Sequence, residues 1–133
     1  MDRRLQKGYS AEERFILACL ERNIPISRPV FNVEPYDFII EINNKFKSVQ
    51  IKTIYNGSKS QYTVELRNTN YSHNGRRAVG SHKDVDYLVI PLNKSDWFII
   101  PRRCFKDKTS ALIVNPNGKY KSYINKWDFE DDD

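Results

Sequence analysis

The chain has 133 residues, of which 39% are apolar and 29% charged, and it carries a formal net charge of +5. This length fits one domain that buries its own core, and the apolar content argues against disorder. The longest apolar run, residues 15–20, is far shorter than the ~18 residues of a membrane span. Two cysteines form no disulfide framework. We therefore expect a reduced, cytoplasmic protein without membrane contact.

The charge is unevenly distributed, because five of the last six residues are acidic. The 127 residues before them carry 22 basic and 12 acidic groups, a net charge of +10. A basic body indicates a polyanionic partner, most often nucleic acid, although many soluble proteins are basic. We expect a single domain over residues 1–127 and a disordered acidic tail over residues 128–133.

Residues 11–22 are predicted to form a helix. Ser10 and Glu13 have the spacing of a capping box, and Pro25 follows the end of the segment. Four apolar residues at helical spacing predict its buried face: Phe15, Ile16, Cys19 and Leu20.

Most of the remaining chain reads as short strands rich in β-branched and aromatic residues. This pattern predicts an α/β or α+β fold, with the leading helix packed on a central, mixed or mostly antiparallel sheet. The expected strands are residues 36–42, 46–54, 62–66, 86–92, 96–101 and 111–114.

A two-residue turn at 43–44 is predicted to join the first two of these strands. The numbers of paired residues then sum to 87, so Asp37 lies opposite Gln50 and Lys52 lies one pair further on the same face. A loop one residue longer or shorter would break this register. Asp37 is unusual in an otherwise apolar strand.

Glu12 falls within the apolar stripe of the predicted helix, where an unpaired carboxylate is costly. We expect a cationic group to meet it. Glu12 can also be read as a complement to the helix dipole, and Asp37 with Lys52 as a structural ion pair. Neither reading accounts for Gln50.

Carboxylate and amide oxygens are ligands that suit Mg²⁺ or Mn²⁺ better than Zn²⁺. A lysine beside such a site can stabilise the transition state electrostatically. With a basic surface, this set predicts metal-assisted hydrolysis of a nucleic-acid phosphodiester.

Three segments, residues 7–23, 35–42 and 49–53, resemble the PD-(D/E)XK nuclease superfamily. The resemblance implies a restriction-endonuclease-like core. It also implies that Glu12, Asp37, Gln50 and Lys52 are catalytic, and that Asp37, Gln50, Glu12 and the backbone carbonyl of Ile51 hold the metal.

This chain has Gln50 where the family usually has a carboxylate. In that Q-x-K variant, and in residues 83–101, it is most similar to the small homing endonucleases encoded in group I introns. It is more distantly similar to archaeal Holliday junction resolvases.

The resemblance implies a Mg²⁺-dependent endodeoxyribonuclease, with Mn²⁺ as a substitute, that cuts double-stranded DNA at specific sites. One compact domain presents one active site, and cutting two strands needs two, so we expect a homodimer or homotetramer. Two alternatives stay open. One is a structure-specific nuclease such as a junction resolvase, and the other is a DNA-binding module that Gln50 has left weak or inactive.

Residues 67–83 lack apolar periodicity and contain no acidic residue. A stretch of this length without regular structure is typically functional, although it can also be a solvated basic loop. Its basic and polar side chains are predicted to contact phosphates or base edges: Arg67, Tyr71, His73, Asn74, Arg76, Arg77 and Lys83.

Overall fold

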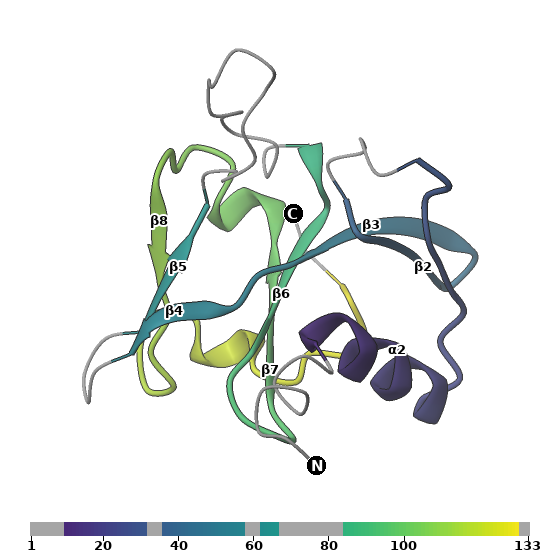
Figure 1. Ribbon diagram of the computed structural model, residues 1–133, viewed down its shortest axis with the longest axis horizontal. Coiled ribbons are helices and arrows are strands. Elements are labelled where there is room, and N and C mark those ends of the chain that lie inside the picture. The colour runs from purple at the N-terminus through teal and green to yellow at the C-terminus, as the bar shows by residue number, and fades with distance from the viewer. Residues whose placement is uncertain (1–9, 32–35, 58–61, 67–83, 131–133) are drawn as a thin grey trace.

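The structure, a computed structural model, describes residues 10–31, 36–57, 62–66 and 84–130 (Figure 1). Its elements are α2 (Ala11–Glu21), β1 (Ile26–Ser27), β2 (Phe38–Ile42), β3 (Lys45–Ile51), β4 (Ile54–Gly57), β5 (Tyr62–Glu65), β6 (Tyr87–Pro91), β7 (Trp97–Pro101), the 3₁₀ turn η2 (Arg102–Cys104), β8 (Ala111–Ile113) and the 3₁₀ turn η3 (Lys121–Tyr123).

The strands form two sheets. The first has the order β1-β2-β3-β6-β7, in which β3 and β6 are parallel and the other neighbours antiparallel. The second is antiparallel, with the order β4-β5-β8. Helix α2 lies on the β2 and β3 side of the molecule, away from the second sheet (Figure 1). The predicted fold, a leading helix packed on a mixed sheet, is confirmed.

Helix α2 begins as predicted, where the Ser10 side chain accepts a hydrogen bond from the backbone N–H of Glu13 at 3.4 Å. The placement of Leu20 on the buried face was wrong, since Leu20 is 59% exposed. At 100° per residue it lies about 140° around the helix from Phe15, on the far side from the core. The buried residues are Phe15, Ala18 and Cys19.

The hairpin of β2 and β3 has the predicted register. Its ladder runs from Phe38 opposite Val49 to Ile42 opposite Lys45, and the paired numbers sum to 87 throughout. The two turn residues, at 43 and 44, have φ of 51° and 64°, as a type I′ turn requires. The turn therefore sets which residues of the two strands share a face.

The expected strand over residues 46–54 was wrong as a single element. Strand β3 ends at Ile51, and β4 begins at Ile54 in the second sheet. The backbone N–H of Lys52 still donates to the Val89 carbonyl at 3.1 Å, so the chain follows β6 up to Lys52 and then leaves. The residues before and after Lys52 are equally typical of strands, so the composition does not indicate that the chain changes sheets there.

Two apolar cores fill the two faces of the five-stranded sheet. On the α2 side, the Phe15 ring contacts those of Phe38, Trp97 and Trp127, with centroids 5.8–6.0 Å apart. Between the sheets, buried residues of β6 and β7 pack against β5 and β8. Strands β6 and β7 are thus covered on both faces, which explains their continuous apolar sequence.

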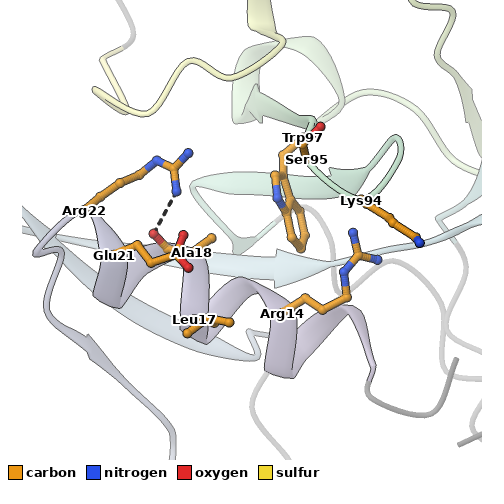
Figure 2. A pocket seen from close by; sticks show the side chains of 8 residues that line it. All are labelled: Arg14, Leu17, Ala18, Glu21, Arg22, Lys94, Ser95 and Trp97. Atoms are coloured by element: carbon orange, nitrogen blue, oxygen red, sulfur yellow. Dashed lines mark hydrogen bonds between the residues drawn. The ribbon is translucent and has the colours of Figure 1, made fainter. Parts of the chain in front are cut away.

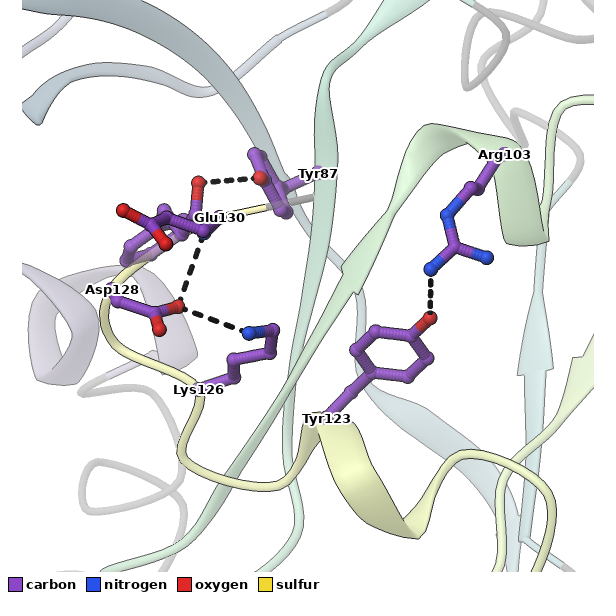
Figure 3. A network of polar contacts seen from close by, with 7 residues as sticks. Tyr87, Arg103, Tyr123, Lys126, Asp128 and Glu130 are labelled. Carbon is purple, nitrogen blue, oxygen red and sulfur yellow. Dashed lines mark hydrogen bonds and ion pairs between the residues drawn. The ribbon is translucent and has the colours of Figure 1, made fainter. Parts of the chain in front are cut away.

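The chain continues in the core past residue 127, where the acidic tail was expected to start. Phe129 is 1% exposed and packs edge-on against Tyr87 at 5.1 Å. The Tyr87 hydroxyl donates to the Phe129 carbonyl at 2.6 Å, and Figure 3 shows this end of the chain folded against β6. Residues 131–133 lie outside the described part. None of the described helices is long and apolar enough to cross a membrane.

Candidate active site

Asp37 lies directly before β2 and is tied to the end of β3. Its backbone N–H donates to the Val49 carbonyl at 2.8 Å, and its Oδ2 accepts from the backbone N–H of Ile51 at 2.7 Å. The side chain is half-buried. Two backbone contacts therefore hold this carboxyl beside the last residues of β3.

Glu12 reaches the same place from the first turn of α2. Its half-buried carboxyl shares a hydrogen bond with that of Asp37. The described group beside Glu12 is thus a second carboxyl, and the expectation that a cation meets Glu12 stays a prediction. The register of the hairpin alone does not reveal this contact, because it depends on how α2 packs against the sheet.

The pKa of Asp37 is raised from 3.8 to about 6, mainly because burial penalises the charged form. The backbone N–H of Ile51 opposes this rise, the charge and hydrogen bond of Glu12 add to it, and the charge of Lys52 lowers it slightly. Two carboxyls in contact accommodate one shared proton or one cation far better than two negative charges.

Gln50 lies between Val49 and Ile51, which pack in the core on the α2 side. Its partner on β6, Leu88, packs in the other core, so the Gln50 side chain is directed to that face. The Gln50 Oε1 atom is buried and has no hydrogen-bond partner among the described residues. An unpaired buried oxygen is costly unless a ligand satisfies it.

Lys52 is the first residue after β3 and is half-buried. Burial lowers the pKa of its ammonium group, and the charges of Asp37 and Glu65 oppose that fall. Glu65, at the end of β5, was not among the predicted site residues. The alternation of side chains over residues 62–66 puts Glu65 on the opposite face of the strand from the buried Val64. It does not show where the second sheet packs.

These groups fit a hard divalent cation. The described residues contain no cluster of three His, Cys, Asp or Glu side chains. The oxygen donors that the described residues offer are the facing carboxyls of Asp37 and Glu12 and the unpaired oxygen of Gln50. The unpaired Gln50 oxygen and the two facing carboxyls are the features that such an ion would satisfy.

Comparison with known proteins identifies the family. The sequence profile of the PD-(D/E)XK endonucleases matches residues 2–130. The chain belongs to this family. The structure of a bacterial homing endonuclease, I-Ssp6803I, matches with a TM-score of 0.72 over 95% of this chain and 91% of that chain. The two are 18% identical, so this likeness concerns the fold. No curated protein matches the chain.

The family confirms the predicted resemblance and the assignment as an endodeoxyribonuclease, and members of this family generally use divalent metals. The predicted DNA-contacting segment of this endonuclease, residues 67–83, lies outside the described residues. That prediction covers Arg67, Tyr71, His73, Asn74, Arg76, Arg77 and Lys83, and it stays a prediction.

Proposed function

We propose that this endonuclease hydrolyses DNA phosphodiester bonds with Mg²⁺, or Mn²⁺ in its place, and makes double-strand breaks at specific sites. The observation that supports the proposal is the contact of α2 with the sheet: the Glu12 carboxyl lies against Asp37, Asp37 is bonded to Ile51 at the end of β3, and the charges of Asp37 and Lys52 act on each other. Carboxyl and ammonium groups interact there in a half-buried setting, which suits metal-assisted phosphodiester hydrolysis, and the unpaired oxygen of Gln50 supports including this residue.

We assign the metal to Asp37, Glu12, Gln50 and the carbonyl of Ile51. When bound, a divalent cation neutralises charge that develops on the phosphoryl oxygens and activates water. The chain's own residues do the positioning. Asp37 is fixed by the Ile51 N–H. To the Lys52 ammonium, which is partly shielded from water, we assign the role of donating to a phosphate oxygen and stabilising its charge.

Double-strand cleavage needs two such sites, and one chain supplies one. The proposal therefore includes a homodimer or homotetramer. Site-specific cutting is supported by the fold, which resembles that of a bacterial homing endonuclease over 95% of the chain. A reducing, cytoplasmic setting completes the proposal.

Cleavage of supercoiled plasmid libraries with Mg²⁺, Mn²⁺ or EDTA tests this function. Asp37→Asn removes one charge with little change of shape, and Asp107→Asn makes the same change at an exposed residue as a matched control. We expect discrete products with wild type and with Asp107→Asn, and none with Asp37→Asn or in EDTA. Sequencing of the product ends then gives the recognised site.

Two results would replace the proposal with one of its alternatives. Cutting of four-way junctions regardless of sequence would identify a structure-specific nuclease. Salt-sensitive DNA binding without cleavage in either metal would identify a binding module, in which the loss of charge at Gln50 has disabled the site.

A further inference from the structure

A second polar site lies on the other side of α2 from the carboxyl cluster. It is a pocket of about 280 Å³ between α2 and the turn that joins β6 to β7 (Figure 2). Three cationic side chains line it, Arg14 from α2, Arg22 from its C-cap and Lys94 from the turn, together with Glu21. Trp97, at the start of β7, forms part of its wall.

The two arginines are held in place by the fold. Arg14 donates to the Asn93 carbonyl at 2.7 Å and lies 5.3 Å from the centre of the Trp97 ring. Arg22 donates to the Ala18 carbonyl at 3.0 Å and lies 4.1 Å above the Trp127 ring. Each guanidinium has five N–H donors, so most of them stay available to a ligand.

The pocket lining carries three positive charges and one negative charge, that of Glu21, so its net charge is positive. Within the described ranges, no ion pair joins Arg14, Arg22 or Lys94 to a carboxylate, even though Glu21 lines the same pocket. In Figure 2 the guanidinium of Arg14 and the amine of Lys94 end on the same side of the pocket. Like charges brought together in this way repel each other unless an anion lies between them.

We propose that this pocket binds a phosphate of the DNA backbone other than the one that is cut. Guanidinium groups that lie against aromatic rings can donate two parallel hydrogen bonds to phosphate oxygens, and Lys94 adds a flexible point charge. Trp97 is 3% exposed, so the ring serves to hold Arg14 rather than to contact a ligand, and the exposed apolar side chain of the lining is Leu17. This inference rests on the proposed function, which supplies the DNA.

The position of the pocket on α2 supports a role in holding the substrate. The same helix carries Glu12 in its first turn, Arg14 one position after Glu13, and Arg22 as its C-cap. At 1.5 Å per residue, Arg14 and Arg22 lie about 3 Å and 15 Å beyond Glu12 along the helix axis. A phosphate held in the pocket would therefore fix α2, and with it the Glu12 carboxyl, relative to the bound duplex.

The salt dependence of DNA binding tests the inference. Binding of a labelled duplex is measured by fluorescence anisotropy in EDTA at several salt concentrations, for wild type, Lys94→Gln and the double variant Arg14→Gln/Lys94→Gln. Lys121→Gln, at an exposed lysine in η3 and outside the pocket lining, is the matched control for charge. We expect the slope of log K against log[salt] to fall by about 0.9 in the double variant, the value for one phosphate contact.

The single variant Lys94→Gln changes an exposed residue, so it tests the inference even if the double variant misfolds. Its slope of log K against log[salt] should fall by part of the same amount. A slope that is unchanged in both variants, or that falls equally in the Lys121→Gln control, would overturn the inference. Wild-type protein without salt-sensitive DNA binding would instead refute the proposed function itself.

A second experiment uses inorganic phosphate to distinguish a phosphate of the DNA backbone from a free phosphate ion as the ligand of the pocket. The protein has two tryptophans, and the pocket arginines lie against both, so an anion that moves either guanidinium should change the tryptophan emission. Phosphate is compared with chloride at equal ionic strength. A phosphate-dependent change that the double variant loses, combined with an unchanged DNA slope, would assign the pocket to a free phosphate ligand and overturn the DNA assignment.

Discussion

Asp37→Asn should stabilise the metal-free protein at neutral and alkaline pH, although it should abolish cleavage. The Asp37 carboxyl has its pKa raised from 3.8 to about 6 in the folded state. A raised acid pKa contributes stability that is fully present below the ordinary value of 3.8 and is lost as the pH rises through 6. Asparagine stays neutral, and it can still accept from Ile51 and donate to Glu12.

The size of the effect follows from the pKa. One pKa unit corresponds to about 1.4 kcal/mol, so a rise from 3.8 to about 6 removes about 3 kcal/mol of stability at pH 8. The same linkage removes about 1 kcal/mol at pH 4.5, where the folded carboxyl is protonated and the unfolded one largely is not. Asp37→Asn should recover about these amounts at the two pH values.

Urea unfolding in EDTA at pH 8 and pH 4.5 measures both quantities. Asp107→Asn, at an exposed residue, should change the free energy of unfolding by less than about 0.5 kcal/mol at either pH. A loss of stability in Asp37→Asn at pH 8, or a gain that does not shrink at pH 4.5, would refute the reasoning. Added Mg²⁺ should stabilise wild type more than the variant, because the ion binds the folded carboxylate.

Four further substitutions test the core and the site. Phe15→Ala should lower the free energy of unfolding by about 3–5 kcal/mol in urea, because the ring is fully buried among aromatic residues; a loss below about 1 kcal/mol would contradict this packing. Tyr87→Phe should cost about 1–3 kcal/mol in thermal unfolding, since it leaves the buried Phe129 carbonyl without its donor; an unchanged stability would count against that bond. Lys52→Met should abolish cleavage and leave duplex affinity in gel shifts within about threefold, and normal cleavage would exclude its role in the reaction. Gln50→Glu should tighten Mg²⁺ binding by about tenfold in calorimetry, because a third carboxylate raises the charge of the ligand set; weaker binding would remove Gln50 from that set.

Local chemistry made part of this fold predictable. The cap at Ser10 and the two-residue turn at 43–44 are decided by a few neighbouring residues, and both were read correctly from the sequence. The turn also gave the register of β2 and β3. Where a few neighbouring residues determine the local conformation, the sequence was sufficient to predict the structure.

Contacts between distant segments were not predictable in this way. The change of sheet after Lys52 depends on where β5 and β8 pack, and the burial of Phe129 depends on Tyr87, 42 residues earlier in the chain. Leu20 is as apolar as the buried residues of its helix, and only the packing of α2 decides that it stays exposed. Periodicity identifies an apolar face but not what covers it.

The candidate active site lies where β3 extends beyond the ladder that it forms with β2. Strand β2 begins at Phe38, paired with Val49, so the last residues of β3 extend beyond that ladder. The N–H of Ile51 would have no partner on this edge, and the Asp37 carboxylate accepts it at 2.7 Å. The bond that completes the strand therefore also orients the carboxyl proposed to hold the metal, and it opposes the rise in the pKa of Asp37. A substitution that keeps this acceptor, such as Asp37→Asn, should separate loss of catalysis from loss of fold, whereas Asp37→Ala should combine the two.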